Sequence, residues 1–257
     1  MWYSYISNFF ISPSIVQRPS LEWDLGGRCA HNNDELQVCN VGCEDQTVQP
    51  QTGGYVGTAL KRVDLADAFA TSNHMCLTYL DGTNYINFGQ FRETCIGNPA
   101  LCTEGFTIAF WVKYTHSEND GDRYMMSSTQ AALDGRGMHI KTLDGSTMYV
   151  AVIGSYEYTV SYTSIPNNEW FYLTMVYDHN TGVYLYYDGV LKASDTSAAT
   201  PASTAMDDNG YFVLGAPSHR LGIEAERMIG SFSDLKIFYR ALRGLDVKVL
   251  YDGKFEI

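Results

Sequence analysis

The chain has 257 residues, of which 45% are hydrophobic and 14% aromatic, so it holds enough apolar material for a sizeable core and is not a disordered protein. Its formal net charge of −12, with only 17 lysines and arginines, excludes a nucleic-acid-binding surface, because phosphate recognition needs clustered basic residues. No stretch approaches the run of about twenty apolar residues that a membrane span requires, so we expect no membrane insertion.

The first segment, residues 1–22, is rich in large apolar side chains, and we expect an N-terminal arm there, followed by one domain over residues 23–257. The arm lacks the basic leader and small-residue cleavage site of a signal peptide, which favours a structural role over a targeting remnant. Leaving it in water costs roughly 1.5–3 kcal/mol per large side chain. It is therefore expected either to pack on its own domain or to add to a sheet edge of a neighbouring copy.

The cysteines all lie in the first 102 residues, in an irregular stretch with polar clusters: Cys29, Cys39, Cys43, Cys76, Cys95 and Cys102. An even, clustered set without tight C-x-x-C pairs predicts disulfides, with structural zinc as the alternative. The turn pair Asn98-Pro99 is suited to bring Cys95 and Cys102 within bonding reach, whereas the other pairings stay open. Because disulfides persist in oxidising compartments, we expect a secreted protein or the ectodomain of a larger surface protein.

From Tyr79 onward, short apolar runs alternate with turn signals, including Asp-Gly pairs that suit tight hairpins. Period-two alternation predicts a half-buried strand at 156–162, and WFYLTMVY (170–177) reads as a strand covered on both faces. A hairpin loop at 178–182 leads into a strand at 183–189, and the strand at 233–242 gives way to a short helix around 242–250. The pattern predicts an all-β, two-sheet antiparallel sandwich.

The segments GFTIAFWVKY, EWFYLTMVYDHNTGVYLYYDG, GYFVLGA and IGSFSDLKIFYRAL occur in this order within residues 76–254. The series resembles the laminin-G/pentraxin-like domains of the concanavalin A-like lectin/glucanase superfamily, of the type found in extracellular adhesion proteins. The resemblance implies a jelly-roll that binds rather than catalyses, often with the help of calcium. One departure is that the chain has no cysteine after Cys102, so the strand-to-strand disulfide of pentraxins is absent.

The resemblance also implies candidate calcium ligands. Asp134 falls where the family has an early aspartate ligand, and Glu226 falls near a late one. Glu224 would share a face with Glu226 in an extended segment, and carboxylates supply the hard oxygen donors that Ca²⁺ prefers. The alternative is that all three are ordinary solvated acids, because the Glu-Gln-Asp run that follows the late strand in pentraxins is missing after Leu214-Gly215.

Tyrosine-rich strands suggest either core packing or an aromatic platform for sugars. Tyr184 and Tyr186 are the best platform candidates, because Val183, Leu185 and Tyr187 occupy the opposite face of their strand. The six histidines stand in no catalytic motif, and a lone histidine in a polar loop is usually a surface residue.

We therefore expect a non-catalytic module that binds glycans or extracellular proteins. One alternative is a structural subunit that self-assembles into an oligomer or filament through its apolar arm. A second is a glycoside hydrolase of the same superfamily, for which the nearest carboxylates are again Glu224 and Glu226.

Overall fold

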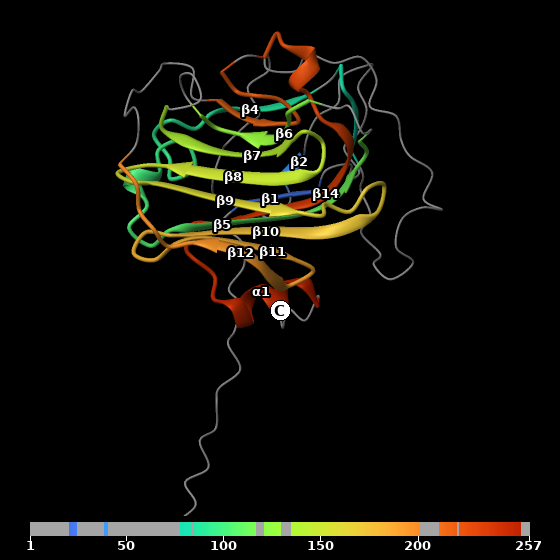
Figure 1. The fold of residues 1–257 in the computed structure, drawn as a ribbon. Coiled ribbons are helices and arrows are strands. Elements are labelled where there is room, and N and C mark those ends of the chain that lie inside the picture. The colour runs from blue at the N-terminus through green and yellow to red at the C-terminus, as the bar shows by residue number, and fades with distance from the viewer. Residues whose placement is uncertain are drawn as a thin grey trace, which may run out of the picture.

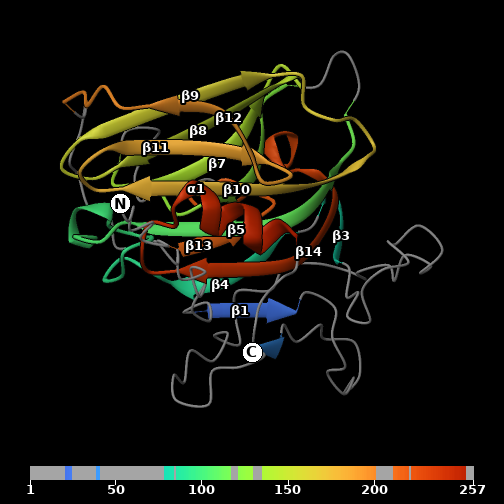
Figure 2. The ribbon, with the colours of Figure 1, turned by 90° about the horizontal axis from the view of Figure 1, so that it is seen from below.

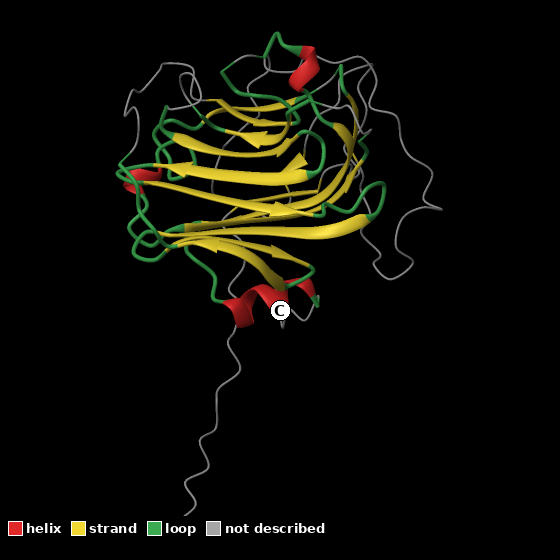
Figure 3. Cartoon of the chain, viewed as in Figure 1, coloured by secondary structure: helices red, strands yellow, loops and turns green. Residues whose placement is uncertain are grey.

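The regular structure of the described residues consists almost entirely of antiparallel strands (Figures 1 and 3). The computed structural model describes residues 21–24, 39–40, 78–83, 85–116, 121–129, 135–200, 211–219 and 221–252. Residues 1–20 of the predicted arm and most of the cysteine-rich stretch lie outside these ranges, so the division at residue 22 stays a prediction. No helix in the described ranges is long and apolar enough to cross a membrane.

The first sheet, here called the β5 sheet, has the strand order β12-β11-β10-β5-β14-β1-β2, with β3 also paired to β14. Its strands are β1 (Leu21–Asp24), β2 (Cys39–Asn40), β3 (Thr78–Asp81), β5 (Phe106–Tyr114), β10 (Trp170–Asp178), β11 (Gly182–Tyr187), β12 (Val190–Asp195) and β14 (Ile229–Phe238).

The second sheet, the β7 sheet, has the order β4-β13-β6-β7-β8-β9. Its strands are β4 (Ile86–Gln90), β6 (Arg123–Ser127), β7 (Gly137–Leu143), β8 (Thr147–Ile153), β9 (Glu157–Thr163) and β13 (Tyr211–Leu214). Short 3-10 turns, η2 (Pro99–Leu101) and η3 (Glu224–Glu226), and one helix, α1 (Gly244–Tyr251), complete the described elements.

The core lies between the two sheets and follows the period-two pattern of the strands. Inward residues of β7 and β8, such as Met138, Ile140 and Val150, pack against Phe110 and Leu173 of the β5 sheet. The predicted strands at 156–162, 170–177 and 183–189 and the predicted C-terminal helix are confirmed as β9, β10, β11 and α1. The sequence-based prediction of an antiparallel two-sheet sandwich is therefore confirmed.

The helix α1 covers the outer face of the β5 sheet (Figure 2). Val247 and Leu250 of α1 join a second apolar cluster with Tyr172, Val176 and Tyr186. This cover explains why β10 is apolar on both faces: one face meets the core and the other meets the helix. The two outer faces of the sandwich thus differ, since no α-helix of the described ranges packs on the β7 sheet.

Candidate functional site: the outer face of the β7 sheet

The predicted calcium ligands are only partly visible in the structure. Asp134 lies outside the described residues. Glu224 and Glu226 lie in η3, where successive residues turn about the axis, so they do not share the face that an extended segment would give them. Glu224 forms an ion pair of 3.5 Å with Arg227. No group of three His, Cys, Asp or Glu side chains in the described ranges is placed to hold a metal, and these two glutamates do not by themselves fit a calcium site.

The predicted tyrosine pair lies on the outer face of the β5 sheet, as the alternation of β11 indicated. Outward does not mean exposed, however, because Tyr186 lies in the apolar cluster beneath α1 and is only 8% exposed. The expectation that Tyr186 is an exposed platform is therefore wrong, and Tyr184 beside it is half-buried. A ligand-binding role for either residue stays a prediction.

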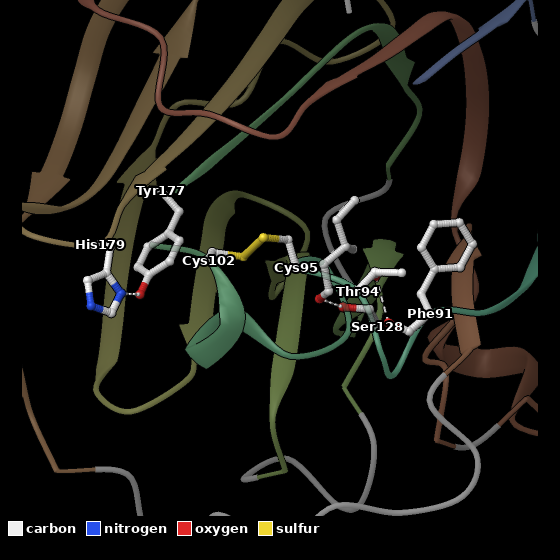
Figure 4. The surroundings of a disulfide bond; sticks show 8 residues. Phe91, Thr94, Cys95, Cys102, Ser128, Tyr177 and His179 are labelled. Carbon is white, nitrogen blue, oxygen red and sulfur yellow. Dashed lines mark hydrogen bonds between the residues drawn. A yellow bond between two sulfur atoms is a disulfide. The ribbon is translucent and has the colours of Figure 1, made fainter. Parts of the chain in front are cut away.

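One predicted disulfide is present. Cys95 and Cys102 are bonded, with a Cα–Cα distance of 5.0 Å, and the bridge closes the loop that leads into β5 (Figure 4). The Ser128 hydroxyl donates a hydrogen bond of 2.6 Å to the Ile96 carbonyl inside this loop. Cys29, Cys43 and Cys76 lie outside the described residues, and only the backbone of Cys39 is described, so their pairing stays a prediction.

The outer face of the β7 sheet carries two adjacent rows of outward side chains that the strand register places side by side. The first row runs across four strands as Tyr124, Lys141, Tyr149 and Ser161. The second row runs as Ser127, His139, Ala151 and Thr159. Directly opposed residues of an antiparallel sheet share a face and lie within contact distance, so these rows lie side by side on one face of the sheet. Five of the eight residues are buried, Tyr149 and Thr159 are half-buried, and Ser161 is exposed.

Lys141 is held between two aromatic rings in the first row. Its Nζ atom lies 5.6 Å from the ring centroids of both Tyr124 and Tyr149 and donates a hydrogen bond of 2.7 Å to the Asp122 carboxylate. Cation–π contacts and the ion pair fix the ammonium group, which is why Lys141 is buried although it lies on an outer face. The charge of Lys141 is thus already paired within the protein.

His139 is the centre of the second row. The imidazole is 3% exposed, and neither ring nitrogen has a hydrogen-bond partner in the described part of the chain. Its ring stacks on Tyr149 at 5.6 Å and meets Tyr124 at 5.7 Å. Burial above all, followed by the positive charges of Lys141 and His219, lowers the pKa of His139 to about 3, so the ring is neutral at physiological pH.

Hydroxyl groups continue the polar surface toward β13. The Ser127 and Ser218 hydroxyls are 2.9 Å apart, and Ser218 also donates a hydrogen bond of 2.6 Å to the Thr129 carbonyl. These contacts fix the segment after β13 next to β6, and His219 in this segment packs edge-on against Tyr124. The face therefore combines aromatic rings, hydroxyls, a paired ammonium and an unpartnered neutral imidazole.

This group of residues was not predicted, because the histidines were expected to lie in loops. His139 instead lies in β7, whose sequence GMHIKTL alternates the core residues Met138 and Ile140 with His139 and Lys141. The same period-two pattern that located the other strands marks this pair of polar residues on one face, so the signal was present in the sequence.

The two antiparallel sheets packed face to face define a jelly-roll sandwich. A laminin-G family model, described as the concanavalin A-like lectin/glucanases superfamily, matches residues 80–248. The chain belongs to this superfamily, as its resemblance to laminin-G/pentraxin-like domains predicted. Among curated proteins, no sequence matches the chain significantly.

Solved structures that match the chain include two binding domains of botulinum neurotoxins. The botulinum neurotoxin serotype G binding domain is 17% identical, with a TM-score of 0.46, over 60% of this chain and 37% of that chain. The receptor-binding domain of the botulinum neurotoxin C/D mosaic serotype is 15% identical, with a TM-score of 0.49, over 68% of this chain and 42% of that one. The present chain thus spans less than half the length of these domains, and such identities do not transfer a ligand.

Proposed function

We propose that the protein is a non-catalytic, extracellular binding module that recognises glycans through the outer face of its β7 sheet. The observation that carries this proposal is the row Tyr124, Lys141, Tyr149, with the unpartnered imidazole of His139 beside it. Aromatic rings pack on the apolar faces of pyranose rings, and fixed polar groups next to them give orientation and specificity. On the opposite outer face, α1 covers Tyr172, Val176 and Tyr186.

The carboxylates of the described residues favour binding over hydrolysis. A retaining glycosidase needs two carboxyl groups about 5–5.5 Å apart, one as acid and one as nucleophile. On this face Asp122 is engaged by Lys141, and Glu224 is paired with Arg227 at the rim. The described residues therefore supply a surface for a sugar without an acid and nucleophile pair on it.

Two serines on edge strands provide a matched test. Ser161 of β9 is exposed and lies directly opposite Tyr149, whereas Ser194 of β12 is exposed and lies directly opposite Tyr184 on the other outer face. Binding to an immobilised polysaccharide panel is expected to be lost in Ser161→Arg, whose bulky cation blocks the surface, and retained in Ser194→Arg. The reverse result would move the site to the tyrosines of the β5 sheet.

Calcium assistance remains a proposal that rests on Asp134, Glu224 and Glu226. The same panel, read with and without a chelator, tests it. Loss of binding on chelation that calcium restores would support a calcium site, and unchanged binding would rule out calcium assistance at this surface.

A structural subunit is the second candidate, and one observation favours it. Val190 and Leu191 on the edge strand β12 are 53% and 49% exposed, and Leu245 at the start of α1 is 74% exposed. Exposed apolar residues on an edge strand are suited to pairing with a second copy. Light scattering that shows a monomer at all concentrations, for wild type and Leu191→Lys alike, would exclude this candidate.

A further inference from the structure

His139 presents a defined pattern of hydrogen-bonding groups. A neutral imidazole has one N–H donor and one bare nitrogen acceptor, and in this protein both are buried and unpartnered within the described residues. Buried polar atoms without partners are rare in folded proteins and each needs a reason, because they cost stability. A ligand that supplies both missing partners is one such reason.

The pattern discriminates between classes of saccharide. A sugar hydroxyl both donates and accepts, so it can pair with either nitrogen of the neutral ring. A carboxylate or sulfate group only accepts, so it can pair with the N–H but not with the bare nitrogen unless the ring takes up a proton. Burial and the neighbouring charges oppose that proton, since they lower the pKa of His139 far below its ordinary value.

The pairing of Lys141 also favours a neutral sugar over an acidic one. An acidic sugar is normally held by an unpaired lysine or arginine. Lys141, the ammonium group next to His139, is already bound to Asp122 at 2.7 Å and enclosed by two tyrosine rings. Binding an acidic sugar there would require Lys141 to leave Asp122, whereas a hydroxyl-bearing sugar needs no such exchange.

Tyr149 is the less buried of the two tyrosine rings that contact His139. The ring of Tyr149 stacks on His139 at 5.6 Å, and its side chain is half-buried rather than buried. Binding at His139 would require this side chain to turn aside, which would also offer the tyrosine ring to the face of a sugar. The ligand thereby replaces a ring contact and satisfies two polar atoms at once.

From these contacts we infer that the ligand of the β7 face is an uncharged, hydroxyl-rich saccharide and that His139 hydrogen-bonds to its hydroxyl groups. The inference rests on the proposed function. It assigns His139 as the specificity-determining residue and neutral rather than acidic glycans as the ligand class.

The experiment compares two probe sets on the folded chain: neutral polysaccharides such as mannan, dextran and galactan, and acidic ones such as heparin and polysialic acid. Wild type is expected to retain neutral probes at least about tenfold more tightly than acidic ones, the effect of one lost hydrogen-bond pair. His139→Phe keeps the ring shape but no polar atom and is expected to lose neutral binding. His139→Gln keeps a donor and an acceptor and is expected to retain part of it.

The outcomes separate the two proposals. Retention of no saccharide by wild type would overturn the proposed function itself. Preferential binding of acidic probes would overturn the inference but leave the glycan-binding function standing. Neutral binding that His139→Phe leaves unchanged, with a thermal melt showing that the variant is folded, would overturn the role of His139.

Discussion

The carboxylate of Asp195, the last residue of β12, accepts a hydrogen bond of 2.9 Å from the backbone N–H of Thr159 in β9. These strands are the edges of different sheets, so one side chain joins the two layers at the side of the sandwich. Just beyond it, the backbones of Glu157 and Ala199 exchange two hydrogen bonds, of 2.9 and 3.0 Å. The edge of β9 is thus partly closed by the chain that leaves β12, which protects it from pairing with other molecules.

Replacing Asp195 by alanine is expected to lower the free energy of unfolding by about 1–2 kcal/mol, because Thr159 and Ser197 lose their acceptor. Burial raises the pKa of Asp195, but hydrogen bonds from Ser197 and Thr159 outweigh it and lower the pKa below the ordinary value. The contribution of Asp195 is therefore present at neutral pH and lost as pH falls through its folded pKa. Urea unfolding at pH 7 measures the effect. Ser194→Ala, an exposed neighbour, is the control, and equal stability of the two variants would contradict the role of Asp195.

The Cys95–Cys102 bridge offers a second test, because it closes a short loop with a sequence separation of 7. The double variant Cys95→Ala, Cys102→Ala is expected to lose about 2–3 kcal/mol of stability through the greater entropy of its unfolded chain. Denaturant unfolding without reductant measures this loss and leaves any other bridges intact. Thr103→Ala, an exposed change next to the bridge, should be neutral, and a double variant as stable as wild type would disprove the prediction.

The sandwich could be predicted from the sequence because its strands alternate strictly where one face is buried. In β14, Leu235 and Ile237 are fully buried and are spaced as the alternation requires. Such a pattern is local, since each residue reports only which side of its own strand it faces. That information fixes the two-sheet class without knowledge of which strands pair.

The site could not be predicted so well because burial on an outer face depends on distant segments. Tyr186 faces outward as expected, but α1, more than fifty residues later, covers it. The bend at η3 has a similar origin, since the guanidinium of Arg227 donates to the carbonyls of Thr83 and Leu221 and holds the segment in a turn. Neither contact can be predicted from the local sequence pattern around Tyr186 or residues 224–226.

Gly105 gives a third prediction, on the turn that starts β5. Its φ is +72°, and a Cβ atom there would lie 2.0 Å from the Tyr177 carbonyl oxygen. Gly105→Ala is therefore expected to destabilise the fold by more than about 2 kcal/mol, through both the left-handed backbone and the clash. Gly222→Ala is the matched control, because no atom lies within 4 Å of a Cβ at that position. Thermal melts that shift equally for the two variants would rule out this explanation.

The burial of His139 predicts how stability depends on pH. In the unfolded chain its pKa returns to about 6.5, whereas in the folded protein it is about 3. Above pH 6.5 the ring is neutral in both states and contributes no pH dependence. Below it the unfolded state takes up the proton first, so the free energy of unfolding falls by up to about 1.4 kcal/mol per pH unit until the folded ring also titrates.

Replacement of His139 by phenylalanine removes this proton uptake and the unpartnered nitrogens together. The groups that face His139, namely Lys141 on its own strand, Tyr124 on β6, Tyr149 on β8 and His219 after β13, remain in place, as does Asp122 beside Lys141. His139→Phe is expected to be at least as stable as wild type at pH 7 and to lose about 2–3 kcal/mol less than wild type between pH 7 and pH 4.5. Urea unfolding at the two pH values measures this difference. If wild type and variant lose stability in parallel, the imidazole is not held neutral in the folded protein, and its use as a neutral hydrogen-bonding group for a sugar fails with it.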